Sequence, residues 1–354
     1  MSTLVDFVAL SLLPLMWWRD AAAALRAGDP PSDVLERLTA ERPRQPLASA
    51  SSIRLRAAAA IVRARARHID AIAWSDPQYP PALAAIIDPP PVLWLRGQRA
   101  ALEQPSVAIV GSRAGSPYAL SVAEQLAGDL ATRGVAVVSG LARGVDSAAH
   151  RGALGVGGTT VGVLGSGADV MYPPEHSALA NAMMVCGAVI SELVPGTPPQ
   201  AQFFPRRNRV ISGLVRALVV IEAGAKSGSL ITARCALEQG REVLAVPGNV
   251  LNGRNRGGHA LLRDGAKIVE TADDILEELG VAVTNPGHGQ QASKSSSLEP
   301  VDPILTCVVA GESYDLDVIA QRTGLTPARL LPRLLDLELR GLVRRAGGGR
   351  FIRI

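Results

Sequence analysis

The strongest constraint on the fold is a repeating pattern that begins at residue 106, in which short apolar runs alternate with amphipathic stretches. The runs predict strands at 107–110, 135–139, 160–164, 188–191, 218–222 and 243–246. The amphipathic stretches predict helices at 118–133, 145–152, 174–186, 230–239 and 260–264. Strands that are apolar throughout and are joined by helices form parallel sheets with helices on both faces. The sequence therefore predicts an α/β domain with a parallel sheet.

Almost every predicted strand ends in glycine or serine. Gly111-Ser112-Arg113 follows the first strand, Ser139-Gly140 follows the second and Gly165-Ser166-Gly167 follows the third. In open parallel sheets, ligands bind at the carboxyl ends of the strands. The sequence therefore predicts one binding edge, built from these loops.

Residues 203–233 are predicted to form the centre of that edge. An apolar strand is followed by a small-residue loop, 223–229, and by a helix that starts near Leu230. Backbone N–H groups and the helix dipole favour a phosphate at such a helix start. The block before the strand contains Phe203, Phe204, Arg206, Arg207 and Arg209. Arginines and aromatic rings beside an anion site indicate a polymer of phosphates with bases to stack, rather than one small nucleotide.

Each of these side chains also has a structural interpretation. Arg113 is expected to bind phosphate because its planar guanidinium matches phosphate oxygens, although it could instead pair with a carboxylate. At least one arginine of the 206–209 block is expected to be structural, and Arg209 with Glu222 is a candidate pair. Adjacent residues of a strand or loop rarely both point inward. We therefore expect either Phe203 or Phe204 to be exposed and to stack on a base.

Several patterns resemble known motifs and fail their requirements. The 111–113 loop lacks the G-x-G-x-x-G fingerprint, which disfavours nicotinamide binding. Lys226-Ser227 follows Ala225 where a P-loop requires glycine, so ATP hydrolysis by that route is rejected. Asp146 and His150 lie one helical turn apart, but two ligands are too few for a metal site, and we expect a structural pair. No cofactor, metal or catalytic residue is predicted.

Composition adds broad limits. A chain of 354 residues is expected to form roughly two or three domains. The net charge of +4 is compatible with nucleic acid but does not require it. The three cysteines lie far apart in the sequence, which indicates a reducing compartment. The apolar run at 7–18 is too short to span a bilayer and has no basic residues before it. We expect a cytoplasmic protein with no membrane partner.

The pattern outside the sheet predicts two flanking units. Residues 1–70 are predicted to be all-helical, with helices near 4–18, 19–27, 34–38 and 52–68. The arginines of the last of these helices are interpreted as a solvated face in preference to a phosphate site. The α/β domain is placed at 71–282 and a Gly/Ser-rich linker at 283–300. Residues 301–354 predict a winged helix, with helices at 303–310, 315–321 and 327–340 and a wing of two strands around a glycine tip.

The order of the motifs resembles the DprA/Smf family of DNA-processing proteins. The matching motifs are Asp76-Pro77-x-Tyr79-Pro80, Pro89-Pro90-Pro91-Val92-Leu93, Val110-Gly111-Ser112-Arg113, Ser139-Gly140-x-Ala142-x-Gly144-x-Asp146, Tyr172-Pro173-Pro174, Ser191-Glu192, Phe204-Pro205-x-Arg207-Asn208-Arg209, Ser227-Gly228-Ser229-x-x-Thr232-Ala233 and Pro247-Gly248. They cover residues 70–270, and so many motifs in one order are far more specific than any single one.

This resemblance implies an extended Rossmann-like domain that binds single-stranded DNA, forms homodimers and loads the RecA recombinase in natural transformation. Together with the residue-level reasoning, it implies that DNA contacts Gly111, Ser112, Arg113, Arg143, Phe204, Arg206, Arg207, Asn208, Arg209, Lys226, Ser227, Gly228, Ser229 and Thr232. By the resemblance, Arg113 would contact phosphate, Phe204 would stack on a base, and Arg207 and Arg209 would complete a basic rim. The winged helix is expected to contact either duplex DNA or a protein.

The chain departs from the family pattern in three ways. The resemblance implies a helix-hairpin-helix or SAM-like unit at residues 1–70, but this unit lacks the usual Gly-x-Gly hairpin. The family often has a basic residue three places before the phenylalanine, where this chain has Ala201, so that contact is lost or is taken by Arg206. His259 stands where the family motif G-x-N-x-L-I has asparagine.

An enzymatic alternative comes from a different class of protein. The sheet also resembles nucleotide phosphoribohydrolases of the lysine-decarboxylase-like group, in which a catalytic glutamate closely follows a P-G-G-x-G-T loop. Here Leu230-Ile231-Thr232-Ala233 follows the loop and offers no carboxylate as a proton donor. We therefore expect a DNA-binding protein that is not an enzyme.

Overall fold

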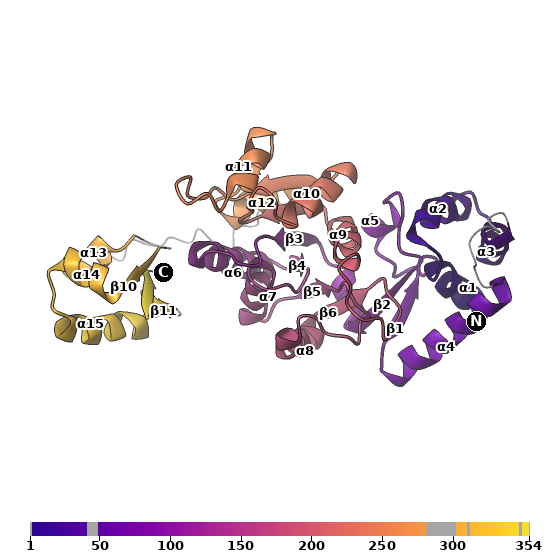
Figure 1. The fold of residues 1–354 in the computed structure, drawn as a ribbon, viewed down its shortest axis with the longest axis horizontal. Coiled ribbons are helices and arrows are strands. Elements are labelled where there is room, and N and C mark those ends of the chain that lie inside the picture. The colour runs from indigo at the N-terminus through magenta and orange to yellow at the C-terminus, as the bar shows by residue number, and fades with distance from the viewer. Residues whose placement is uncertain (1, 41–48, 281–301, 310–311, 347–348, 354) are drawn as a thin grey trace.

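The computed structural model describes residues 2–40, 49–280, 302–309, 312–346 and 349–353. Three units follow one another along the chain: four α-helices, an α/β unit and a winged helix (Figure 1). The predicted linker at 283–300 lies outside the described residues, and the predicted domain boundaries remain predictions.

The α/β unit is built on one nine-stranded sheet with the strand order β1-β2-β6-β5-β4-β3-β7-β8-β9. The strands are β1 Asp70–Ala73, β2 Val92–Gly97, β3 Ser106–Val110, β4 Ala136–Ser139, β5 Thr160–Val163, β6 Ala188–Ser191, β7 Ala217–Val220, β8 Glu242–Ala245 and β9 Lys267–Ile268. The seven strands from β6 to β9 along this order pair in parallel, which confirms the parallel sheet and the six predicted strands, β3 to β8.

The sheet continues past β6 into two strands that the pattern did not indicate. The segment at 92–95, which directly follows a run of prolines, is part of β2, which pairs antiparallel with β6 and with β1. Four consecutive residues of β2, from Val92 to Leu95, are buried. A short apolar strand after a run of prolines cannot be told from a buried loop by periodicity.

Helices cover both faces of the sheet. They are α5 Pro81–Ala84, α6 Pro117–Thr132, α7 Val145–Gly155, α8 Ser177–Cys186, α9 Phe203–Gly213, α10 Ser229–Glu238, α11 Arg256–Arg263 and α12 Ala272–Leu279. The α/β unit also contains two 3-10 helices, Arg99–Leu102 and Pro174–His176. The predicted helices are confirmed as α6, α7, α8 and α10, whereas α11 begins four residues before the predicted 260.

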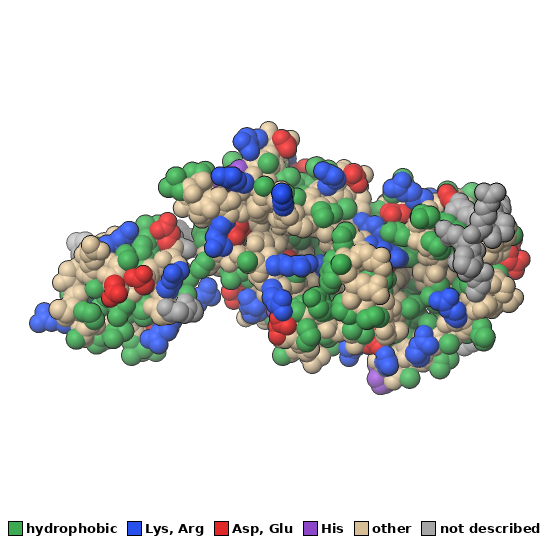
Figure 2. Space-filling model, in the orientation of Figure 1, with side chains coloured by type: hydrophobic (Ala, Val, Ile, Leu, Met, Phe, Trp, Pro, Cys, Tyr) green, Lys and Arg blue, Asp and Glu red, His purple; other side chains and the backbone are tan. Residues whose placement is uncertain are grey.

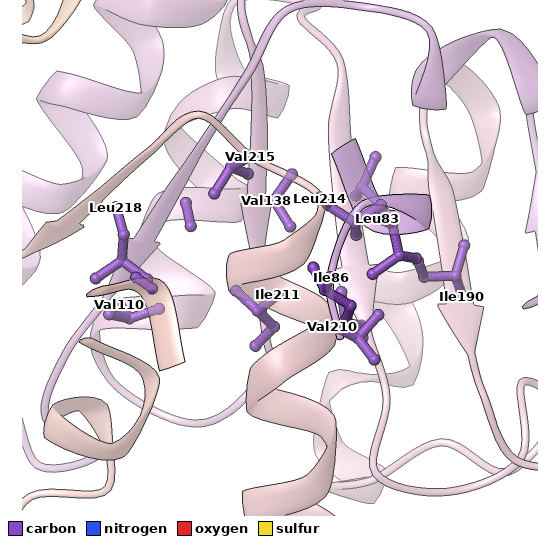
Figure 3. Close-up of a cluster of buried hydrophobic side chains, with 14 of the residues drawn as sticks. Leu83, Ile86, Val110, Val138, Ile190, Val210, Ile211, Leu214, Val215 and Leu218 are labelled. Atoms are coloured by element: carbon purple, nitrogen blue, oxygen red, sulfur yellow. The ribbon is translucent and has the colours of Figure 1, made fainter. Parts of the chain in front are cut away.

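Neighbouring residues of one strand face opposite cores, which explains why these strands are apolar throughout. In β3, Val110 joins one core with Leu218 and with Ile211 of α9 (Figure 3). Its neighbour Ile109 joins the other core, with Leu130 of α6. Both cores are fully buried, so a polar residue at either kind of position would be desolvated without a partner.

The N-terminal helices pack against the antiparallel end of the sheet. They are α1 Ser2–Ser11, α2 Trp18–Arg26, α3 Pro31–Ala40 and α4 Ala50–Ala66, with a 3-10 turn at Leu15–Trp17. Leu10 and Leu35 share one core with Trp94 of β2. The predicted continuous helix at 4–18 is wrong, because α1 ends before Pro14, whose ring cannot continue a helix.

The C-terminal unit is a winged helix, as predicted. Its elements are α13 Pro303–Cys307, β10 Ser313–Asp315, α14 Leu316–Thr323, α15 Pro327–Leu339, β11 Val343–Ala346 and β12 Arg350–Arg353. The three strands pair in the order β10-β12-β11, and Leu330 and Phe351 share its core. α15 continues through Pro332. Of the predicted glycine tip, residues 347–348 lie outside the described part of the chain.

Among the described residues, none of the helices combines the length and the apolarity that crossing a membrane requires.

One contact between α6 and α7 leads to a test of the packing. A methyl group at Gly152 would lie 2.0 Å from the carbonyl oxygen of Glu124, whereas at Gly155 of the same helix it would have no neighbour within 4 Å. We expect Gly152→Ala to lower the free energy of unfolding by about 1–3 kcal/mol, the usual cost of overpacking. Gly155→Ala is the control and should leave it unchanged or raise it by up to about 1 kcal/mol. Urea unfolding checks both, and equal stability of the two variants would contradict this packing.

Candidate functional site

A cavity of about 800 Å³ lies at the carboxyl ends of β3 and β7. It is bounded by the loop after β3, by α9 and by the loop between β7 and α10. Ten of the residues expected to contact DNA line it: Gly111, Ser112, Arg113, Phe204, Arg207, Asn208, Ser227, Gly228, Ser229 and Thr232. The predicted binding edge therefore coincides with a real cavity.

Two aromatic rings and one cation form an array in this cavity. The Arg113 guanidinium carbon lies 5.5 Å from the centroid of the Phe204 ring, and the Phe204 and Tyr172 centroids lie 5.4 Å apart with their planes tilted by 48°. Tyr172 is 40% exposed. A flat nucleobase could stack on these rings while its phosphate meets Arg113. We call Arg113, Phe204 and Tyr172 the stacking array.

Tyr172 was not among the predicted site residues, although it belongs to a motif that the sequence analysis quoted. It follows β5 on a long loop, 164–173, that precedes the 3-10 helix. Only the three-dimensional position of that loop beside α9 brings its ring to Phe204. Gly165 on the same loop leaves space for the Phe204 ring, because a methyl group at this position would lie 2.9 Å from that ring.

The rotation of α9 decides which residues of the 203–209 block reach the cavity. Phe204, Arg207, Asn208 and Ile211 recur at helical spacing and line the cavity. Arg206 and Arg209 do not belong to this lining. Phe203 and Phe204 were expected in a strand or loop with one ring exposed, but both lie in the first turn of a helix and both are half-buried.

Arg207 lines the cavity but is a buried, structural side chain. Its Nη1 donates to the carbonyl oxygens of Gly140 and Val163, each at 2.6 Å, at the ends of β4 and β5. Burial lowers the pKa of Arg207 to about 10, and the Asp146 carboxylate partly offsets that effect. The Asp146 carboxylate in turn accepts the Gly140 and Ala142 N–H groups at 3.2 and 3.3 Å.

Arg206 and Arg209 point toward the N-terminal helices. Both pair with the buried Glu192 carboxylate, and Nε of Arg206 lies 2.8 Å from one of its oxygens. Both guanidinium groups also lie over the Trp18 ring, with their carbon atoms 4.3 Å (Arg206) and 5.4 Å (Arg209) from the ring centroid. The predicted Arg209–Glu222 pair is wrong. Glu222 instead accepts the N–H and hydroxyl of Ser116 at 3.0 and 2.6 Å and so fixes the start of α6.

Two more predicted contacts lie outside the cavity lining. Lys226 is exposed in the loop before α10. Arg143 is exposed and forms an ion pair with Glu175. Several Lys and Arg side chains gather across the middle of the face shown in Figure 2.

The loop before α10 provides the expected helix start. α10 begins at Ser229, whose hydroxyl lies 2.7 Å from the Ser227 hydroxyl, and both serines line the cavity. The N–H groups of Leu230 and Ile231 already donate to the carbonyl oxygens of Ser227 and Gly228, each at 3.1 Å. The helix dipole and the two serine hydroxyls are therefore what this end offers to an anion.

The acidic groups near the cavity have structural partners. Asp146 is the one carboxylate among the residues that line the cavity. His150 lies one turn further and is held by Thr160, with Nδ1 2.7 Å from Oγ1. Asp146 and His150 thus have separate partners, and the expected pair does not form. Among the described residues, no group of three His, Cys, Asp or Glu side chains could hold a metal ion.

Comparison with known proteins gives a consistent result. Residues 70–280 match the family described as DNA recombination-mediator protein A, and residues 290–349 match the DprA winged helix domain. Protein Smf of Escherichia coli K12 is 41% identical over 276 residues, which are 77% of this chain and 74% of the relative. DNA processing protein DprA of Streptococcus pneumoniae R6 is 43% identical over 203 residues, 57% of this chain and 72% of the relative.

Two solved structures are also similar. The X-ray structure of DprA from Streptococcus pneumoniae superposes with a TM-score of 0.66 at 34% identity, covering 77% of this chain and 95% of that one. A structure of DNA processing protein A from Helicobacter pylori, described by its single-stranded DNA binding mode, has a TM-score of 0.54 at 27% identity and covers 60% and 95%.

The different burial of the two cavity arginines gives a test. Arg207→Ala would leave two buried carbonyls and the Asp146 carboxylate uncompensated, so we expect it to cost about 3–5 kcal/mol in the free energy of unfolding. Arg113→Ala removes an exposed side chain and should change stability by less than about 0.5 kcal/mol. Thermal and urea unfolding measure both. A stable Arg207→Ala protein would contradict the structural assignment of Arg207.

Proposed function

Because the chain belongs to the DNA recombination-mediator protein A family, also known as DprA/Smf, we propose that it binds single-stranded DNA in the cavity at the sheet edge. The observation that carries this proposal is the stacking array beside the start of α10. Arg113 would neutralise a phosphate, Phe204 and Tyr172 would stack on bases, and the Ser227–Ser229 loop would receive a second phosphate. Because Arg113 and Tyr172 are exposed, a strand could enter without refolding the domain.

We propose roles for the residues of α9 that differ from the expected basic rim of Arg207 and Arg209. Phe204 and Asn208 would meet the strand, while Arg207 would shape the cavity floor from behind. Arg206 and Arg209 would contribute through their contacts with Glu192 and Trp18 rather than through phosphate contacts. Lys226 and Arg143, which are exposed outside the lining, would add to the positive field that attracts the strand.

The partners of the acidic side chains near the cavity favour a binding function over the phosphoribohydrolase alternative. Glu222 fixes the start of α6, and Glu192 holds two arginines. Burial raises the pKa of Asp146, but its carboxylate is held by two backbone N–H groups and by the charge of Arg207. Glu222 and Glu192 are outside the cavity lining, and Asp146, which belongs to it, is held by protein groups.

We further propose that the chain acts as a homodimer in the cytoplasm and loads the RecA recombinase onto the bound strand. The support is the recombination-mediator family and the motifs shared with it. The winged helix would make a separate contact, either with duplex DNA or with a protein. Its α15 carries arginines together with Asp336 and Glu338, and exposes Leu331, Leu335 and Leu339, so its surface is not uniformly basic.

The binding proposal predicts a specific loss of affinity in the stacking array. Phe204→Ala should weaken binding of a labelled oligo-dT by about 1–3 kcal/mol, the usual contribution of one stacked base. Arg113→Ala should also weaken binding and should reduce the slope of log K against log salt by about 0.7, because one phosphate contact is lost. Fluorescence anisotropy at several salt concentrations measures both, with matched duplex as competitor.

Arg151→Ala provides the control, because Arg151 is exposed on α7 and lies outside the cavity lining. Unchanged affinity in both array variants, with their folds intact by circular dichroism, would rule out this site. Absence of single-strand binding together with release of a nucleobase from a nucleoside monophosphate would establish the enzymatic alternative.

The loading proposal predicts a second loss in the same variants. On single strands coated with single-strand-binding protein, the wild-type chain should shorten the lag before RecA ATP hydrolysis. Phe204→Ala should leave the lag long at concentrations where the wild type acts, since it cannot reach the strand. A wild-type chain that binds the single strand and yet leaves the lag unchanged would contradict loading without affecting the binding proposal.

A further inference from the structure

α4 is a long helix with one face in the N-terminal core and the other in solvent. Ile53, Ala57, Ala60, Ile61 and Ala64 are buried against α1 and β1. Figure 1 shows α4 along the outer edge of the N-terminal unit. Its inner face satisfies the packing of this unit, so the composition of its outer face needs a separate explanation.

The outer face carries an apolar stripe. Leu55, Ala59, Val62 and Ala66 are exposed and recur at intervals of four, three and four residues, the spacing of a helix-pairing seam. Leu55 is 74% and Val62 66% exposed. Two large apolar side chains alternate with two alanines, and small residues between large ones let a second helix approach closely.

The charged residues that α4 itself places beside this stripe are all of one sign. Arg56, Arg63 and Arg65 are exposed next to the stripe, and α4 contains no acidic residue. The other arginines of this helical region are used within the chain: Arg54 pairs with Asp6 and Glu36, and Arg67 pairs with Asp169. The three outward arginines therefore differ from their neighbours in facing solvent beside an apolar stripe.

We propose that the outer face of α4 is a docking surface for an acidic amphipathic helix of a partner protein. The partner would lay leucine-like side chains along Leu55 and Val62 and place Asp or Glu side chains opposite Arg56, Arg63 and Arg65. This is the helix-pairing mode in which apolar contacts give affinity and flanking charges select the partner. The inference does not depend on the cavity or on DNA.

The charge pattern argues against two other occupants. A second copy of the same helix would bring arginines against arginines, which disfavours self-pairing. Nucleic acid would satisfy the arginines, but Leu55 and Val62 would then lie against phosphates and gain nothing from burial. Both occupants give distinguishable results in the test.

The test uses a fluorescein-labelled helical peptide of about 18 residues, long enough to form several turns, with leucine along one stripe and glutamate beside it. Its twin has lysine in place of every glutamate. We expect the full chain to bind the acidic peptide roughly tenfold tighter than its twin in anisotropy, because like charges oppose the twin. The double variant Leu55→Ser/Val62→Ser should bind the acidic peptide at least about fivefold more weakly than the wild type does. The double variant Arg56→Glu/Arg63→Glu should bind the lysine peptide more tightly than the acidic one, which reverses the preference of the wild type.

Arg234→Glu/Leu237→Ser is the matched control, since these residues expose an arginine and a leucine on α10. It should bind both peptides as the wild type does. The proposal is overturned if neither peptide binds, if charge reversal leaves the preference unchanged, or if the control loses binding equally. It is also overturned if duplex DNA or anionic phosphatidylglycerol vesicles bind through Arg56 and Arg63 while the serine variant binds them normally. Sedimentation that shows self-association through Leu55 and Val62 would overturn it in favour of a second copy.

Discussion

The buried guanidinium of Arg207 holds the candidate site together. It binds the carbonyl oxygens at the ends of β4 and β5 and thereby fixes α9 over the sheet edge. The contact is tight, because a methyl group at Gly140 would lie 2.2 Å from Nη1 of Arg207. A glycine at the strand end is therefore required for the arginine to reach its partners. The position of Phe204, one turn earlier on α9, follows from this attachment.

The opposite side of the same helix connects the site to the N-terminal unit. Trp18 is buried beneath Arg206 and Arg209. Glu192, directly after β6, pairs with both arginines, and Asp88 lies 3.7 Å from Arg209, so two carboxylates face the two guanidinium charges. A buried carboxylate shared by two guanidinium groups is stable only when its partners are kept in place. α9 is thus fixed from both sides, and Phe204, the member of the stacking array that lies on α9, is presented by a helix with little freedom to rotate.

The parts of this arrangement that depend on local pattern can be predicted from the sequence. Apolar runs such as 107–110 gave the strands, and the glycines and serines after them gave the binding edge. The roles of the α9 arginines do not follow from local pattern, because they depend on the rotation of one helix. A shift of one position along α9 moves a side chain from the cavity to the side that faces the N-terminal helices. Tyr172 and β2 were missed for a related reason, since each is placed by contacts between segments far apart in the chain.

The central claim is that a single strand lies across Phe204 and Tyr172 with a phosphate at Arg113. Ultraviolet crosslinking of an oligonucleotide that contains 5-bromouracil, followed by peptide mass spectrometry, tests it most directly. We predict crosslinks to Phe204 or Tyr172, and their loss when excess unlabelled oligo-dT competes. Crosslinks confined to the winged helix or to α4, with none on the cavity lining, would contradict the account.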